Sequence, residues 1–487
     1  MRFANARDAQ SAPLVGRSAT SPHAYPSGVG LRGSMEAAAS GRADPIPPGS
    51  APAAREGATF RRTLRRRHAI ALYVSSVLGS GILVLPGLAA DLAGPASLIA
   101  WALIAAASLP FALTFAAMSA RHPEAGGIYG FAREAFGPGV AQVTGWLFAL
   151  WMVTGAPAVA LIAASYLGYA FPLTRPETFL LGYAIVAGPF LINYRGILLS
   201  GRVQLAVLVA IVGLLVAAIA LSGLRLSAGN FVPFAPNGIA PIGTAAALIV
   251  WSFLGYENVS NVAEEFEDPR RDFSRSIGAS VAVIAALYVG VAVVTIGTGA
   301  YRAGGGVAPF AALLGNVLGP YGAMGTALLA ALIIFGVVNA YTTGMSRVFY
   351  AAAKDGAFPR RLARLDPASG APGRALLVLF AILSGVFVVY YVLAVDLESA
   401  LLVSSGTAII VYVIGTAAGV RLRPPLAGRR RWTIPAISLG ISLVVAPFVG
   451  PLLLLPVGVA VAAFIAYAVR QRWGGRSGPP PGTPTAK

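Results

Sequence analysis

The feature that most constrains this chain is a run of glycine and proline inside an apolar stretch long enough to cross a bilayer. The stretch begins near Ala69 and contains Gly79-Ser80-Gly81-Ile82-Leu83-Val84-Leu85-Pro86-Gly87. Glycine does not shield the backbone and proline lacks an amide hydrogen, so we expect a helix to unwind here. Unpaired backbone groups at membrane depth must then face a cavity or a ligand.

A second break of the same character lies in a later apolar span, at Ser252-Phe253-Leu254-Gly255-Tyr256-Glu257. About five apolar spans separate the two breaks, so each occupies a matching place in one half of the chain. Paired broken helices in two halves are the best sequence indication of a transporter binding site. The two breaks therefore predict a site for a transported solute.

The composition independently indicates a membrane protein. The chain of 487 residues is 57% hydrophobic and only 11% charged, with a mean hydropathy of +0.74, whereas soluble domains are nearer one quarter charged. The net charge of +18 comes from arginines between apolar spans, which indicates a lipid bilayer and no nucleic acid as partner. Cysteine is absent, which excludes disulfides, thiol catalysis and cysteine-based metal sites.

The chain divides into two polar tails and a membrane domain. Residues 1–60 and 473–487 are predicted to be disordered tails, and Met35 is an alternative start; residues 61–472 form the transmembrane domain. The predicted fold is an all-α integral membrane protein with about 12 transmembrane helices. The apolar spans are 69–92, 94–120, 128–171, 177–194, 197–223, 240–265, 276–300, 320–352, 373–395, 397–420, 433–449 and 451–469.

Basic residues predict the orientation, because lysine and arginine stay on the cytoplasmic side of a membrane. With the N-terminus inside, the outer loops hold only Arg175, Arg225 and Arg302. We therefore expect a multi-pass protein of the inner (plasma) membrane with both termini in the cytoplasm.

The breaks offer complementary groups for an α-amino acid. Free amides at the start of a half-helix attract a carboxylate, and free carbonyls at the end of another attract an ammonium. We place the carboxylate on the Ser80, Gly81 and Ile82 amides, beside Gly79. The ammonium is placed on the carbonyls of Val77, Trp251 and Leu254. The alternative is that the glycines only allow close helix packing.

One acidic and several aromatic residues are candidates for coupling and gating. Glu257 lies within an apolar span, where a carboxylate is costly unless it is paired, protonated or hydrated. It either carries a proton during transport or anchors the break structurally. Trp151 and Phe253 are candidate gates, and Tyr341 is a candidate substrate contact, although most intramembrane aromatics only pack or face lipid.

Five motifs in order resemble the amino acid–polyamine–organocation (APC) superfamily over about residues 66–470. The motifs are Gly79-Ser80-Gly81-Ile82, Pro123-Glu124-Ala125-Gly126-Gly127-Ile128-Tyr129, Trp251 to Glu257, Glu267-Asp268-Pro269-Arg270-Arg271, and Lys354-Asp355-Gly356-Ala357-Phe358-Pro359. The resemblance implies a LeuT-like 5+5 inverted repeat with helices 1 and 6 discontinuous around an amino acid, plus two C-terminal helices. It also implies that a bundle of helices 1, 2, 6 and 7 rocks against the rest.

Within that superfamily, the segments 145–148, 155–157 and 264–273 resemble the bacterial exporters of methionine and branched-chain amino acids. Tyr341 stands where arginine–agmatine exchangers carry a tryptophan, which argues against a guanidinium substrate. The only lysines are Lys354 and Lys487, so the helix 5 lysine of some proton-coupled relatives is missing. Glu257 becomes the candidate protonation site.

These observations predict a secondary active transporter that works by alternating access. Neutral apolar amino acids (methionine, leucine, isoleucine, valine) moving outward by proton antiport are the first expectation; proton-coupled uptake or exchange is the second. Sodium coupling and a homodimer are compatible with the sequence. We expect no enzyme activity, no cofactor and no metal site, since no catalytic constellation is visible. A non-transporting receptor or scaffold is the alternative from another class.

Overall fold

The computed structural model describes residues 77–121, 127–195, 201–256, 269–302, 305–354, 356, 358–366, 372–426 and 428–474. The chain divides into two units, Met1–Thr59 and Phe60–Lys487, and all described residues belong to the second. The predicted tail at 1–60, Glu257 and most of the tail at 473–487 lie outside the described residues. The last helix extends through Gly474.

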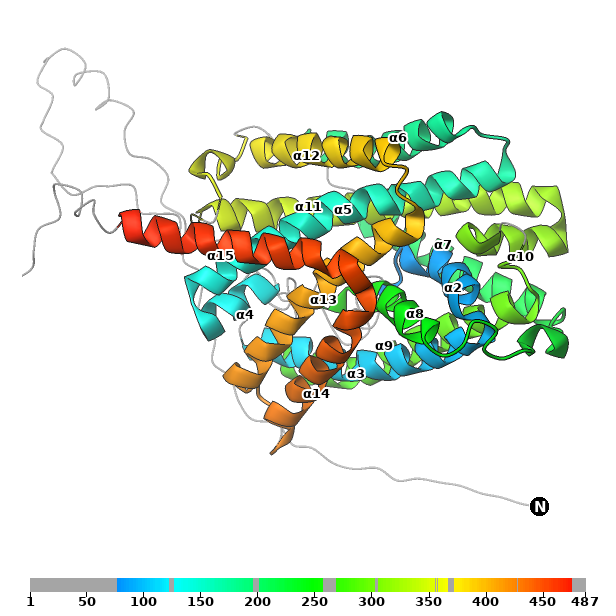
Figure 1. Cartoon of the computed structure of the whole chain (residues 1–487), viewed down its shortest axis with the longest axis horizontal. Coiled ribbons are helices and arrows are strands. Elements are labelled where there is room, and N and C mark those ends of the chain that lie inside the picture. Colours follow the sequence, from blue (N-terminus) through cyan, green and yellow to red (C-terminus); the bar gives the residue numbers. More distant parts are fainter. Residues whose placement is uncertain are drawn as a thin grey trace, which may run out of the picture. The chain divides into compact units, whose positions relative to one another are not determined.

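The described residues form helices, with no strand among them (Figure 1). Long apolar runs favour this outcome, because only a helix satisfies all its backbone groups internally within a bilayer. The α-helices are α2 (Gly81–Ala93), α3 (Ser97–Arg121), α4 (Gly127–Phe136), α5 (Pro138–Ala170), α6 (Arg175–Tyr194), α7 (Gly201–Gly223), α8 (Pro241–Val250), α9 (Pro269–Gly297), α10 (Pro309–Leu318), α11 (Pro320–Lys354), α12 (Gly373–Val392), α13 (Leu397–Leu422), α14 (Arg430–Val445) and α15 (Leu454–Gly474).

Eight segments of the described chain are long and apolar enough to cross a membrane. Two of them, Gly81–Ser119 and Arg430–Arg472, each contain two of the predicted spans. The all-α membrane fold is confirmed, and the count of twelve crossings stays a prediction.

Two details of the predicted spans were wrong. The span at 128–171 is divided at Gly137, whose φ of 87° favours glycine, so α4 and α5 are separate helices. The apolar helix α10 was missed because its 10 residues are too few to cross a bilayer. It begins at Pro309, where the missing amide hydrogen costs nothing.

Helix α5 lies at the centre of the packing, and its membrane-length window is 94% buried. Helix α5 packs against α11, α13, α6 and α15. Helices α2 and α3 each pack against α8 and α9. Figure 1 shows α5 and α11 running alongside each other. The short helices α2 and α8 therefore pack against each other and also against the longer helices α9 and α3, respectively.

Candidate functional site

The first break consists of residues 78–80, immediately before α2. Helix α2 begins at Gly81 and continues through Pro86, so the unwound part is shorter than the predicted run. Ser80 occupies the N-cap position, and its side chain does not cap the helix. The Leu83 amide donates to the Ser80 carbonyl at 3.1 Å. The amides of Gly81 and Ile82 come before the first regular hydrogen bond of a helix and are the ones that another group can use.

The second break follows α8, which ends at Val250. A single 3-10 turn covers Trp251–Phe253, and Leu254 is then extended with φ −79° and ψ 152°. Gly255 follows with φ 123°, a conformation that a side chain would oppose. Glu257 lies outside the described residues.

The two breaks touch each other. A Cβ atom built on Gly81 would lie 2.7 Å from the Oγ of Ser252 and 2.7 Å from the Cδ1 of Trp251. The Trp251 indole also donates a hydrogen bond to the Ser80 hydroxyl, with an Nε1 to Oγ distance of 3.4 Å. The start of α2 is therefore in direct contact with the turn that ends α8.

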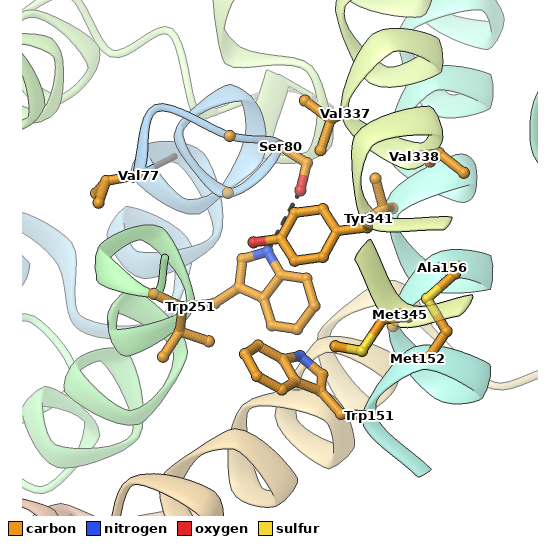
Figure 2. Close-up of a pocket in the computed structure, with 15 residues that line it drawn as sticks. Val77, Ser80, Trp151, Met152, Ala156, Trp251, Val337, Val338, Tyr341 and Met345 are labelled. Atoms are coloured by element: carbon orange, nitrogen blue, oxygen red, sulfur yellow. Dashed lines mark hydrogen bonds between the residues drawn. The ribbon is translucent and has the colours of Figure 1, made fainter. Parts of the chain in front are cut away.

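A cavity opens beside this contact, and its lining is mostly apolar, as is usual for small-molecule sites. Figure 2 draws Val77, which precedes the first break, Ser80 from that break, Trp251 from the second break and Tyr341 of α11 around the same space. The lining residues are Val77, Gly79, Ser80, Gly81, Trp151, Met152, Gly155, Ala156, Val159, Trp251, Leu254, Val337, Val338, Tyr341 and Met345.

The structure brings most of the predicted site residues to this cavity. Those that line it are Val77, Gly79, Ser80, Gly81, Trp151, Trp251, Leu254 and Tyr341. The Ile82 side chain is fully buried in the core, although its amide belongs to the first turn of α2.

Phe253 does not face the cavity, so the structure gives it no place as a gate there. Its ring packs 5.0 Å from that of Tyr288 and 6.3 Å from that of Trp101. This aromatic cluster joins the second break to α3 and α9, which is a packing role.

Two of the three carbonyls predicted to bind an ammonium already accept hydrogen bonds. The Tyr288 hydroxyl donates to the Val77 carbonyl at 2.8 Å, and the Leu254 amide donates to the Trp251 carbonyl at 3.4 Å. A carbonyl oxygen has two lone pairs, so each keeps one acceptor site. Tyr288 was not predicted, and it fixes the position of the Val77 carbonyl.

Helices α5 and α11 form a wall of the cavity, and the site predictions included only Trp151 and Tyr341 from it. The lining residues of this wall that were missed are Met152, Gly155, Ala156, Val159, Val337, Val338 and Met345. Gly155 and the nearby Pro157 stand inside the continuous helix α5, and a glycine and a proline within its apolar sequence were the available signal. Next to Gly155 on α5, the Thr154 hydroxyl accepts a hydrogen bond from the Ser404 hydroxyl of α13 at 3.1 Å.

The cavity thus has two chemically different sides. One carries the amides at the start of α2, where the helix dipole favours an anion. The opposite side carries aliphatic and thioether groups from α5 and α11, and Figure 2 draws Met152 and Met345 there. No Asp, Glu, Lys, Arg or His is among the described lining residues. Such a cavity suits a small zwitterion with an apolar body.

The sequence matches known proteins over most of its length. The model of a family described as amino acid permease matches residues 64–473. The uncharacterized amino acid permease YecA of Bacillus subtilis is 32% identical over 407 residues, which cover 83% of this chain and 95% of the relative.

Two further relatives have names that specify amino acids. The L-methionine/branched-chain amino acid exporter YjeH of Escherichia coli is 31% identical over 379 residues, covering 76% of this chain and 88% of the relative. The branched-chain amino acid permease BcaP of Bacillus subtilis is 29% identical over 329 residues, which cover 62% of this chain and 69% of the relative. The chain therefore belongs to the amino acid permease family of the APC superfamily, a family of membrane-embedded transporters.

Proposed function

We propose that the protein exports neutral apolar amino acids by alternating access, in exchange for protons. In this proposal the α-carboxylate of the substrate binds the amides at the start of α2. The α-ammonium binds the free acceptor sites of the carbonyls at the two breaks, and the side chain lies against α5 and α11.

The observation that carries the proposal is the meeting of both breaks at one cavity. Helix α2 begins here with the amides of Gly81 and Ile82. The Ser80 side chain does not cap the helix. A helix start that borders a cavity in this way stabilises an anion by about 1 kcal/mol or more.

The lining supports the class of substrate. A charged side chain would need a charged or strongly polar partner within the membrane, and the described lining offers aliphatic, aromatic and thioether groups. Methionine, leucine, isoleucine and valine match these surroundings.

Direction and coupling rest on similarity to YjeH, whose name describes an exporter. The similarity to BcaP, named as a branched-chain permease, supports uptake or exchange as the second candidate. Glu257 is proposed to carry the proton, since it follows the second break directly in the sequence.

Purified protein in liposomes tests the function. Vesicles loaded with labelled methionine should lose label when an inward proton gradient is imposed, and excess external leucine should compete. A sodium gradient serves as the comparison condition. Failure of the protein to move or bind any of the four amino acids would leave a receptor or scaffold role instead.

Glu257→Gln tests the proton coupling. The amide has a similar shape but does not titrate in this range, so we expect exchange of methionine for leucine to continue while accumulation driven by a proton gradient is lost. The matched control is Glu134→Gln on the exposed face of α4, which should retain coupling. Full gradient-driven transport in Glu257→Gln would return this residue to a structural role.

A further inference from the structure

The indole of Trp251 spans the gap between α2 and α5, and a glycine stands at each end of it. At one end, a Cβ on Gly81 would lie 2.7 Å from the indole Cδ1. At the other end, a Cβ on Gly155 would lie 2.9 Å from Cη2, the far corner of the six-membered ring. Carbon atoms in contact stay about 3.5–4.0 Å apart, so the indole fits only because both residues are glycine.

The position of the indole determines how much of the cavity is free. Trp151 packs against it in a T-shaped contact with ring centroids 6.3 Å apart, and its Nε1 is held by the Ser80 hydroxyl. The remaining side of the indole is the cavity that it lines (Figure 2). Any group added at Gly155 would therefore move the indole into the space for the substrate.

We propose that Gly155 sets the upper size limit of the transported side chain by seating the Trp251 indole away from the cavity. The inference rests on the proposed function, because it assigns the space beside α5 to the substrate side chain. With glycine at this position, the cavity admits side chains of the size of leucine and methionine. Gly155 acts through Trp251 and is a positioning residue for specificity.

Gly155→Ala gives the direct test. Alanine removes the room for Cη2 and reduces the free space by about one methyl group. We expect the affinity for methionine and leucine to fall about tenfold relative to that for alanine, the usual effect of one methylene in an apolar pocket. Binding of L-methionine, L-leucine and L-alanine to the purified full chain by isothermal calorimetry measures this ratio.

Two further variants make the test specific. Gly168→Ala lies on the same helix, where a Cβ meets its nearest neighbour at an ordinary 3.8 Å, and it should keep the wild-type ratio. Trp251→Phe removes the six-membered indole ring and therefore Cη2. In that background the Gly155→Ala change should no longer alter the ratio, as a double-mutant cycle requires of a shared contact.

The possible outcomes separate the inference from the proposed function. A wild-type protein that binds none of the three amino acids contradicts the proposed function itself. A wild-type protein that binds methionine, combined with a Gly155→Ala variant of unchanged ratio, overturns only the role of Gly155. A Gly155→Ala variant that binds all three amino acids equally more weakly also overturns the role of Gly155, because that result indicates general loss of structure.

Discussion

Gly81→Val should abolish amino acid flux while the protein still folds and inserts. The added Cβ would lie 2.7 Å from both the Ser252 hydroxyl and the Trp251 ring, so the two breaks must move apart. The substrate carboxylate then loses its hydrogen bonds to the α2 amides. Two charge-assisted hydrogen bonds together contribute about 3 kcal/mol, which corresponds to a loss of affinity of about 100-fold. Methionine counterflow in liposomes measures the effect.

The control for this variant is Gly325→Val on α11. Gly325 is exposed, and a Cβ there meets no atom within 4 Å, so the same residue change should leave flux at the wild-type rate. Size-exclusion chromatography in detergent compares the folding of both proteins. Wild-type counterflow in a well-folded Gly81→Val protein would contradict the carboxylate site at the start of α2.

The sequence predicted the breaks because they have local causes. Glycine and proline change the backbone wherever they stand, and in an apolar span the freed groups need partners. Gly79, Ser80 and Gly81 therefore indicate a site without knowledge of the neighbouring helices. The same reasoning singled out Trp251 and Leu254, and both line the cavity.

The α5 and α11 wall could not be predicted in the same way. The membrane-length window of α5 is apolar and 94% buried, so no polar face distinguishes the side that meets a cavity from the side that meets a helix. Met152 and Val159 look no different in the sequence from their buried neighbours. Only the arrangement of α5 against α11 makes them lining residues.

Phe253 shows a second limit. Within an unwound segment, the direction of each side chain depends on φ and ψ values that composition does not reveal. Leu254 is extended and lines the cavity, whereas Phe253 packs on Tyr288. Neighbours in one motif can therefore serve binding and packing respectively.

Helix α2 is tightly packed against its neighbours where it extends away from the cavity. Eleven of the 13 residues of α2 are buried, and the Tyr166 hydroxyl of α5 joins this helix to α10 by donating to the Leu83 carbonyl while accepting from the Phe310 amide. One turn further, a Cβ on Gly87 would lie 2.1 Å from the carbonyl oxygen of Gly306. The backbones of α2 and the 3-10 turn Gly305–Val307 are therefore in contact.

In the proposed alternating-access cycle we expect this contact to part once in every round of transport, so a cross-link across it should stop transport. Asp91 lies four residues beyond Gly87 on α2, and its Cγ is 2.9 Å from the Cβ position of Gly306. Because the two side-chain positions approach so closely, we expect cysteines at both positions to form a disulfide. The natural chain contains no cysteine, so the two introduced cysteines are the only thiols of the variant.

The variant Asp91→Cys with Gly306→Cys should therefore transport methionine when reduced and lose flux to the level of empty liposomes when oxidised. Restoring the reductant should restore transport, because only the covalent bond blocks the movement. Asp91→Cys alone should be insensitive to the oxidant. If the oxidised double variant keeps its flux while mass spectrometry shows the disulfide complete, α2 and the Gly305–Val307 turn stay together throughout the cycle. The pathway would then have to open between other helices, and the contacts around Tyr166 would belong to the fixed part of the transporter.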